Sequence, residues 1–318
     1  MLPSALTLIN PRIQLSMTTH TALEPVPSFS CREARFKLDD DLILPANTRL
    51  EFEESLAKIR FHRTIYLDWG FGEVDPMGRS TILNFYGPPG TGKTMAADAL
   101  AGVLNLPIIE ISIAELESKF MGETARNIQA AFASAYEAGA LLFFDEADTL
   151  LGKRLSSVTQ GIDNEVNSMR STLLIELERF EGVVVFATNF ARNYDEAFLG
   201  RITHHVSFQL PDIDGRRQLW ARMLVSGIPL GEARDAIIEE AATLSDGFSG
   251  RDIRNAMRLA LPKAILAAQH TRHAAQLTST HIASAIAQIL NARANVASGG
   301  HTLAASTQAA TRLLGLNS

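Results

Sequence analysis

The sequence has little cysteine and no long apolar run. Cys31 is the one cysteine among 318 residues, so the chain cannot form an internal disulfide, and no group of cysteines and histidines has the spacing of a metal site. No apolar stretch reaches the roughly 18 residues that a membrane helix requires. The short apolar stretch at residues 6–9 is not preceded by the charged segment of a secretory signal. We therefore expect a cytoplasmic protein without a membrane span.

The sequence also has no excess of positive charge. Its 35 Asp and Glu residues outnumber its 29 Lys and Arg residues, which gives a net charge of −6. Proteins that bind nucleic acid do so largely through clustered Lys and Arg, so nucleic acid is not the expected partner. With 46% hydrophobic residues, the chain is long enough for about two domains with cores of their own. This composition favours a protein or a small molecule as the partner.

The clearest motif is a phosphate-binding loop at residues 87–94. It matches the P-loop pattern G-x-x-x-x-G-K-S/T in full, and its residues are Gly87, Pro88, Pro89, Gly90, Thr91, Gly92, Lys93 and Thr94. In this pattern backbone N–H groups and Lys93 contact phosphate oxygens, and the Thr94 hydroxyl is a ligand of Mg²⁺. A predicted strand at 81–86 precedes the loop and a predicted helix starts at Met95. An ordinary Gly/Pro turn is the alternative, but it does not require a strand before it and a helix after it. The motif predicts that the loop and Met95 bind ATP with Mg²⁺.

A second motif lies at residues 141–148, where four apolar residues are followed by adjacent carboxylates. This is typical of a buried parallel strand that ends at the carboxyl edge of a sheet, where α/β folds bind ligands. As in a Walker B element, Asp145 would hold Mg²⁺ through water and Glu146 would polarise the water that attacks the γ-phosphate. A capping pair at a helix start is the alternative. Asp-Glu-Ala-Asp also occurs in DEAD-box RNA helicases, but this sequence shows neither the second motor domain nor the Ser-Ala-Thr motif that they need.

Alternating strands and helices predict a parallel sheet that is covered on both faces. Further strands are expected at 107–111, 182–188 and 205–210, and helices at 47–61, 123–138, 165–180 and 215–224. The predicted fold class is α/β, a three-layer P-loop NTPase domain at residues 33–212. Asn189 ends one of these strands, where it can bind the attacking water or the γ-phosphate; a turn-forming asparagine is the alternative. His204 and His205 have no further ligands nearby in sequence, so we expect them to be structural.

After residue 212 the pattern predicts helices alone. They are expected at 233–243, 250–269 and 280–293, with Ser249 and Thr280 as N-caps and a kink or break near Pro262. We expect them to form a small helical lid domain at residues 213–294. Residues 1–32 are expected to be a flexible leader, with Met17 as an alternative start, and residues 295–318 a mobile tail.

Four motifs in this order resemble the AAA+ superfamily, in its AAA clade. They are GPPGTGKT at 87–94, LLFFDEAD at 141–148, ATN at 187–189 and GFSGRDI at 247–253, and the resemblance covers residues 35–293. It implies an ATPase with ATP and Mg²⁺ as cofactors and with Glu146 and Asn189 in catalysis, the latter as sensor 1. It implies that Gly250 of the lid approaches the adenine and ribose. It also implies a ring of identical subunits, a homohexamer.

The resemblance assigns two further motifs that act in such a ring. Residues 118–123 match the aromatic-hydrophobic-glycine pore loop of the clade, so Lys119, Phe120 and Met121 are expected to grip a client polypeptide in a central channel; a core phenylalanine is the alternative. Residues 195–201 align with the stretch that ends in arginine fingers, which act on a neighbouring subunit's γ-phosphate. Arg201 is the expected catalytic finger, with Arg192 as the alternative, because the pair of arginines that many relatives carry is missing here.

The most specific expectation concerns the client. The compact chain is similar to the pachytene-checkpoint family, whose members remodel HORMA-domain proteins and whose bacterial forms keep anti-phage nucleotide-cyclase signalling off. The resemblance implies an ATP-driven remodeller that pulls a client through its pore and disassembles a HORMA-domain complex. The alternatives are a katanin-like or vacuolar-sorting-type disassembly ATPase, a DNA-directed AAA+ ATPase, which the acidic composition disfavours, and a nucleotide-gated scaffold.

Overall fold

A six-stranded sheet forms the centre of the structure, a computed structural model that describes residues 29–75, 80–112, 116, 123–152, 160–189, 194–271 and 274–313. Its strand order is β1-β3-β4-β5-β2-β6. The strands are β1 (Cys31–Arg32), β2 (Thr81–Tyr86), β3 (Ile108–Ser112), β4 (Leu141–Asp145), β5 (Val183–Thr188) and β6 (His204–Ser207). Strands β2 to β6 run parallel, and β1 pairs antiparallel with β3. The predicted α/β fold class is confirmed. Strand β1 lies at the edge of the sheet, and its two residues are the last two of the segment that the sequence analysis expects to be a flexible leader.

Burial on both faces explains why the central strands are apolar throughout. Strand β5 reads Val-Val-Val-Phe-Ala-Thr, and every one of its side chains is buried. Along β4, Leu142 and Phe144 belong to one core while Leu141 and Phe143 belong to the other. Successive side chains of a strand point to opposite faces, so a sheet with a core on each side needs such continuous apolar runs.

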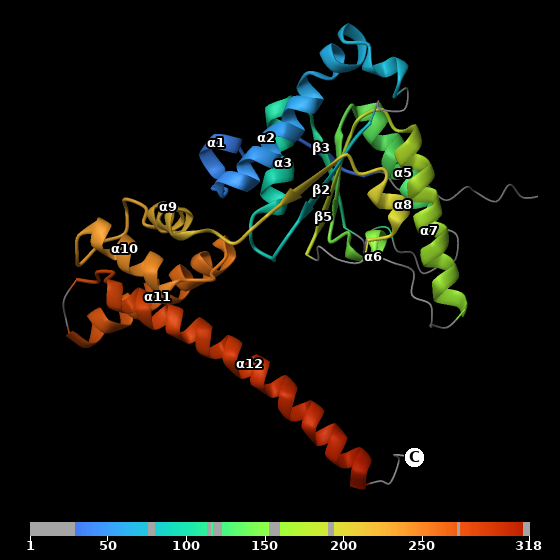
Figure 1. The fold of residues 1–318 in the computed structure, drawn as a ribbon. Helices are drawn as coiled ribbons and strands as arrows, with labels where there is room; N and C mark the ends of the chain where they lie inside the picture. Colours follow the sequence, from blue (N-terminus) through green and yellow to red (C-terminus); the bar gives the residue numbers. More distant parts are fainter. Residues whose placement is uncertain are drawn as a thin grey trace, which may run out of the picture.

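Helices cover the two faces of the sheet (Figure 1). One face carries α1 (Leu38–Asp41), α2 (Ala46–Arg60) and α3 (Lys93–Leu104), and the other carries α5 (Glu123–Ala138), α6 (Asp148–Leu151), α7 (Gln160–Arg179) and α8 (Glu196–Leu199). A π-helical turn (Thr64–Asp68) and a 3-10 turn (Phe71–Glu73) lie between α2 and β2. The helices predicted around the sheet are confirmed, although α7 begins at residue 160 instead of residue 165.

Four helices beyond the sheet enclose a third core. They are α9 (Ile213–Met223), α10 (Arg234–Leu244), α11 (Gly250–Thr271) and α12 (Ser279–Leu313). Trp220 is fully buried in this core, and its indole N–H donates to the Ser245 hydroxyl at 2.9 Å. Ser249 caps α11 as predicted, because its hydroxyl accepts from the Asp252 N–H at 3.3 Å while the Asp252 carboxylate accepts from the Ser249 N–H at 2.8 Å.

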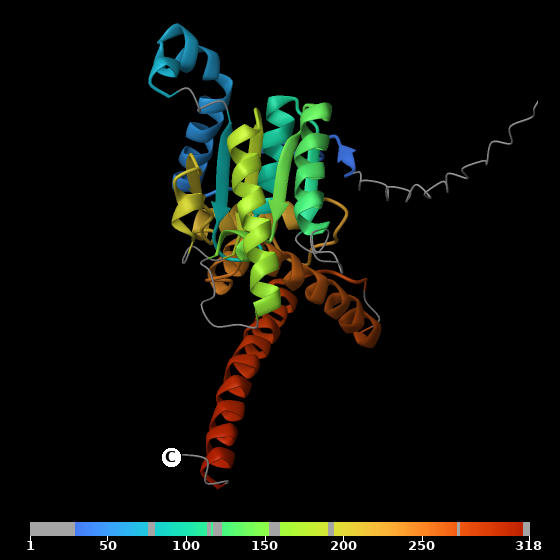
Figure 2. The ribbon, with the colours of Figure 1, turned by 90° about the vertical axis from the view of Figure 1, so that its right-hand side faces the viewer.

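Two of these helices differ from the prediction. Helix α12 begins at Ser279, so Thr280 is not its cap, and it continues to Leu313 instead of ending near residue 293. Figures 1 and 2 show its distal half standing away from the rest of the molecule. This segment is rich in alanine, whose helix propensity outweighs the cost of Gly299 and Gly300. Helix α11 runs through Pro262 without a break. Among the residues that the structure describes, no helix combines the length and apolarity needed to cross a bilayer.

Candidate nucleotide site

The sequence motifs meet at one edge of the sheet because they follow parallel strands. The P-loop comes after β2, the adjacent carboxylates end β4, and Asn189 follows β5. The register pairs Tyr86 with Thr188 and Phe144 with Phe186, so these strands end side by side. This is the carboxyl edge, where open α/β sheets bind their ligands.

The shape of the P-loop depends on two glycines. Gly87 has φ +142°, and a Cβ there would lie 2.0 Å from the Phe208 carbonyl oxygen. Gly90 has φ +79°, and a Cβ there would lie 2.6 Å from the Ser249 hydroxyl oxygen. Larger residues therefore cannot replace either glycine without moving the backbone. The loop is closed further by the Thr91 hydroxyl, which donates to the Pro88 carbonyl at 2.8 Å.

Lys93 is the cation at the centre of this loop. It is buried, and its ammonium donates to the Gly87 and Pro88 carbonyls at 2.8 and 3.0 Å. It also donates to the Asn189 side-chain oxygen at 3.0 Å, which joins two motifs that are 96 residues apart in sequence. Burial lowers the pKa of Lys93 from 10.5 to about 8, although Asp145 and Asp148 oppose the shift. Lys93 lies at the N-terminus of α3, where the helix dipole also favours an anion.

The lowered pKa of Lys93 predicts that the affinity for ATP falls as the pH rises. Above pH 8 the amine is largely neutral in the protein without nucleotide. Phosphate raises this pKa, so binding takes up a proton above pH 8 and the dissociation constant should rise roughly tenfold between pH 7.5 and pH 9. Titration with a fluorescent ATP analogue at each pH measures this change. Lys93→Arg keeps its charge and should give a flat profile; the same slope in that variant would contradict the assignment.

Two oxygen ligands suited to Mg²⁺ lie beside the loop. The Thr94 hydroxyl donates to one oxygen of Asp145 at 3.0 Å, and the other oxygen accepts from the Glu146 N–H at 2.9 Å. Hydroxyl and carboxylate oxygens are the hard ligands that Mg²⁺ prefers, so these residues fit the ion. The described part of the chain has no group of three or more His, Cys, Asp or Glu placed to hold a metal.

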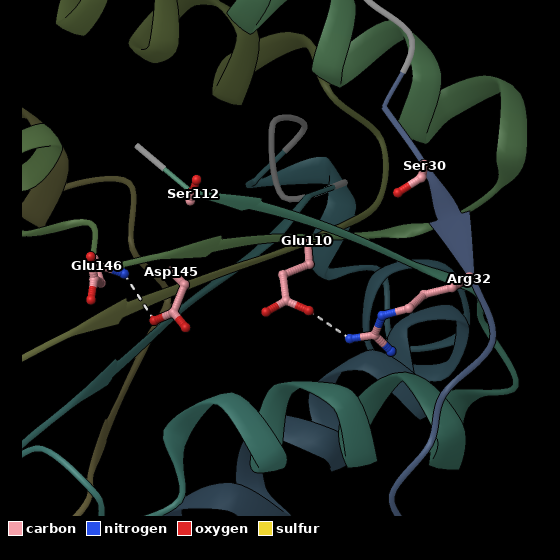
Figure 3. A pocket seen from close by; sticks show the side chains of 6 residues that line it. All are labelled: Ser30, Arg32, Glu110, Ser112, Asp145 and Glu146. Atoms are coloured by element: carbon pink, nitrogen blue, oxygen red, sulfur yellow. Dashed lines mark hydrogen bonds and ion pairs between the residues drawn. The ribbon is translucent and has the colours of Figure 1, made fainter. Parts of the chain in front are cut away.

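Glu146 stands out by its exposure and its backbone. Its side chain is exposed, and its φ of +54° lies in the left-handed region that residues other than glycine rarely adopt. It lines a cavity together with Asp145 (Figure 3). An exposed carboxylate beside a metal ligand can take a proton from a water molecule, which is the role the sequence predicts for it.

The backbone of Asn189 is held by Asp148, a residue to which the sequence analysis gives no role. The Asn189 N–H donates to the Asp148 carboxylate at 3.0 Å. Asp148 is the last residue of the Asp-Glu-Ala-Asp stretch and the first of α6, so only the arrangement of β4 and β5 reveals this contact. Together, Asp148 and Lys93 fix Asn189 from two sides.

A polar network lies under this edge of the sheet. The Tyr194 hydroxyl is 2.8 Å from the Thr188 hydroxyl and accepts from the Asn84 side-chain amide at 3.1 Å. The same amide is 3.3 Å from Nδ1 of His205, and burial lowers the pKa of both His204 and His205. His205 thus belongs to this hydrogen-bonded network.

Arg201 is not part of this cluster. It follows α8, where its guanidinium contacts Glu178, with Nε at 3.1 Å, and donates from Nη1 to the Ala197 carbonyl at 2.7 Å. The nearby Thr203 N–H donates to the Ile82 carbonyl, at the opposite end of β2 from the P-loop. That strand separates Arg201 from its own P-loop by about 17 Å, farther than an arginine side chain reaches.

Some of the predicted site residues cannot be placed. Lys119, Phe120, Met121 and Arg192 lie outside the described residues. Of the others, Met95 is half-buried and packs against the core beneath α3. Gly250 begins α11 and adjoins the loop, where the Arg251 N–H donates to the Gly90 carbonyl at 3.3 Å. The helical lid therefore contacts the P-loop directly. The sequence analysis expects this contact only from the resemblance to AAA+ proteins.

Comparison with known proteins agrees with this geometry. Residues 83–210 match the family described as ATPase family associated with various cellular activities (AAA). The proteasome-activating nucleotidase of Methanothermobacter thermautotrophicus is 40% identical over 176 residues, which cover 53% of this chain and 42% of that protein. The katanin p60 ATPase-containing subunit A1 of Strongylocentrotus purpuratus is 35% identical over 185 residues, which cover 54% and 34%. The chain thus spans less than half the length of these curated relatives.

A solved structure shares the fold. The crystal structure of the FIGL-1 AAA domain in complex with ADP superimposes with a TM-score of 0.61 at 23% sequence identity, over 81% of this chain and 85% of that chain. At this identity the likeness concerns the fold alone. Residues 83–210 of this chain are therefore similar to the AAA ATPase family.

Proposed function

We propose that this protein hydrolyses ATP and uses the energy to remodel a client protein. The observation that carries the first half is the convergence of Lys93, Asn189 and the Thr94–Asp145 pair at one edge of the sheet, with Glu146 beside them. These groups supply a phosphate-binding cation, two metal ligands, a polar side chain for water and a carboxylate base. Phosphoryl transfer needs this combination, because its catalysis consists mainly of positioning and charge stabilisation.

Each residue has a separate task in the proposed reaction. The loop N–H groups and Lys93 bind the phosphates, and Thr94 and Asp145 would hold Mg²⁺, which when bound neutralises charge on the transferring phosphoryl group. Asn189 orients the attacking water through its side-chain oxygen or amide. Glu146 accepts the proton of that water, and its exposure leaves it accessible from the solvent side.

The position of Arg201 supports a site completed by a second copy of the chain. Because Arg201 lies at the opposite end of β2 from its own P-loop, its guanidinium can reach a γ-phosphate only in a neighbouring subunit. Contacts of this head-to-tail kind form a ring where the rotation between subunits closes. A homohexameric ring is the assembly that the resemblance implies, and it is part of this proposal.

The remodelling half of the proposal is supported by the names of the relatives and by the chain's own composition. One relative is a proteasome-activating nucleotidase and another a katanin subunit. The net charge of −6 disfavours nucleic acid as the substrate. The predicted pore loop at Lys119, Phe120 and Met121 would grip the client by aromatic packing as the ring turns over ATP.

A trapping experiment tests the client and the grip together. Glu146→Gln protein with ATP should hold proteins from the native cell, which mass spectrometry identifies. Adding Phe120→Ala should reduce their recovery more than tenfold, because the loss of an anchoring aromatic side chain at an interface costs about 2 kcal/mol or more. Tyr136→Ala is the matched control, since Tyr136 is an exposed aromatic residue on α5.

The composition of the trap decides among the remaining hypotheses. A HORMA-domain protein as the main component would support the specific client that the sequence analysis expects, and another protein would support the general remodeller. Recovery that Phe120→Ala leaves unchanged would contradict the pore grip and favour a nucleotide-gated scaffold. Enrichment of DNA would contradict the protein client.

A further inference from the structure

The segment at residues 29–36 wraps around the free edge of the sheet. Strand β1 pairs with β3 through Cys31 opposite Ile109. On one side of this strand Phe29 packs against the core under α5 and α7, and on the other side Phe36 packs against the core under α3. We call residues 29–36 the N-terminal clasp, since they contact both faces of the sheet.

Asp98 is the point where the clasp holds the P-loop helix. It lies on α3, one turn after Thr94, and only 1% of its surface is exposed. Its carboxylate accepts from Arg32 Nη1 at 2.5 Å, from the Arg35 N–H at 2.6 Å and from the Phe36 N–H at 3.1 Å. Burial by itself raises the pKa of Asp98, but these hydrogen bonds hold it below its ordinary value. The clasp thus supplies the close partners of a buried charge on α3.

Arg32 links this helix to the neighbouring strand. While Nη1 binds Asp98, Nη2 donates to the Glu110 carboxylate of β3 at 2.7 Å (Figure 3). The planar guanidinium offers both donors in a fixed fork, which a lysine could not reproduce. Arg32 therefore makes the closer of two links between α3 and β3, since Arg35 lies 3.4 Å from Asp98 and 3.9 Å from Glu110.

A cavity connects this link with the candidate nucleotide site. It has a volume of about 450 Å³ and is lined by Ser30, Arg32, Glu110, Ser112, Asp145 and Glu146. Figure 3 shows Arg32 and Glu110 at one side of it and the two Walker B carboxylates at the other. The clasp thus borders the same space as the proposed catalytic base.

The packing of α3 shows why such a link is needed. The side chains that α3 buries completely in this core are one leucine, Leu100, and four alanines: Ala96, Ala97, Ala99 and Ala101. A surface made mostly of alanines has few protrusions to interlock with its neighbours, so it fixes the position of the helix along the strands only weakly. Ion pairs with directional hydrogen bonds can fix the position of the helix. The Thr94 hydroxyl belongs to α3 and the Asp145 carboxylate to the sheet, and the two groups are 3.0 Å apart. The position of α3 relative to the sheet must therefore be fixed.

We propose that Arg32 is a positioning residue of the nucleotide site, which holds α3 against β3 through Asp98 and Glu110 and so keeps Thr94 beside Asp145 for metal binding. This inference rests on the proposed ATPase function. It gives the N-terminal clasp a role in Mg²⁺ affinity that no motif in the sequence indicates.

The test compares two neighbouring arginines. Arg32→Gln should raise the Mg²⁺ concentration needed for half-maximal ATP turnover by about tenfold or more, the usual effect of losing a residue that orients a metal ligand. Binding of a fluorescent ATP analogue in EDTA should stay within twofold of wild type, because the P-loop and Lys93 are untouched. Arg35→Gln is the matched comparison, since the Arg35 side chain is 58% exposed and lies 3.4 Å from Asp98 and 3.9 Å from Glu110. Long, exposed ion pairs contribute little, so its Mg²⁺ requirement should stay within about twofold of wild type. Arg32→Lys should restore part of the Mg²⁺ affinity.

Two outcomes would overturn the proposal. One is an unchanged Mg²⁺ dependence in Arg32→Gln, and the other is an equal loss of nucleotide binding with and without Mg²⁺, which indicates general destabilisation. If Arg32→Gln does not fold, Glu110→Ala provides the test, because it removes the β3 acceptor of Arg32 and leaves Asp98 paired; unchanged Mg²⁺ dependence there would also overturn the proposal. If wild type fails to hydrolyse ATP, the proposed function fails, while Mg²⁺-dependent nucleotide binding still tests the role of Arg32.

Discussion

Glu146→Gln is expected to lower the rate of ATP hydrolysis by about 10² to 10⁴, the range that general base catalysis contributes. Glutamine keeps the shape of the side chain but cannot accept the proton of the attacking water. ATP should still bind with near wild-type affinity, because Lys93 and the Thr94–Asp145 pair are unchanged. Phosphate release measures the first effect, and titration with a fluorescent ATP analogue measures the second.

The control for this prediction is Glu137→Gln, which neutralises an exposed carboxylate on α5. It should leave both quantities unchanged. If Glu146→Gln retains normal turnover, the base is another group and the assignment of the Walker B carboxylates is wrong. If it loses ATP binding as well, Glu146 supports the fold of the loop rather than the chemistry.

Arg201→Ala is expected to reduce turnover by about 10³ or more, as loss of an arginine finger does in related phosphoryl transfer. The reason is that the guanidinium stabilises charge on the γ-phosphate of the neighbouring subunit. Nucleotide binding should change little, because Arg201 lies far from its own P-loop. Turnover is measured on the isolated variant and on mixtures with Lys93→Ala protein.

The mixture separates action between subunits from action within one. Lys93→Ala subunits have an inactive loop but an intact Arg201, whereas Arg201→Ala subunits have the reverse. Mixed assemblies should regain a measurable fraction of turnover if the arginine acts across an interface, and none if it acts within its own chain. Arg192→Ala, tested in the same way, decides between the two candidate fingers. Glu178→Gln, which removes the partner of Arg201 but not the guanidinium, should keep most of the activity.

The main parts of the fold follow from local patterns in the sequence. The apolar run at 141–144 and the valine run at 183–185 predict buried parallel strands, because only a sheet with a core on both faces buries such runs. Parallel strands end at a common edge, so topology predicts that the P-loop and Asn189 lie close together, and the hydrogen bond between Lys93 and Asn189 agrees with this. The P-loop and the strand ends thus predict where the site lies.

The remaining features depend on contacts that no local pattern encodes. Strand β1 has two residues, and its Arg32 forms an ion pair with Asp98, which lies 66 positions later in the sequence. Within α3, Asp98 is an aspartate among alanines, which by itself indicates an exposed helix position rather than a buried ion pair. The sequence predicts that the last helix ends near residue 293, before the glycine pair at 299–300, whereas α12 continues to Leu313.

The left-handed backbone of Glu146 has a consequence for engineering this protein. An L-residue in that conformation costs about 1–2 kcal/mol, so the folded state carries strain at the proposed base. Asn105, which ends α3 with the same φ of +54°, carries less strain, because asparagine tolerates the left-handed region at helix ends, and it has no part in the site. A search for more heat-resistant forms would find glycine favourable at both positions, yet at Glu146 the gain in stability would remove the carboxylate. At Asn105, by contrast, a glycine would raise the stability of the protein without removing a group of the proposed site.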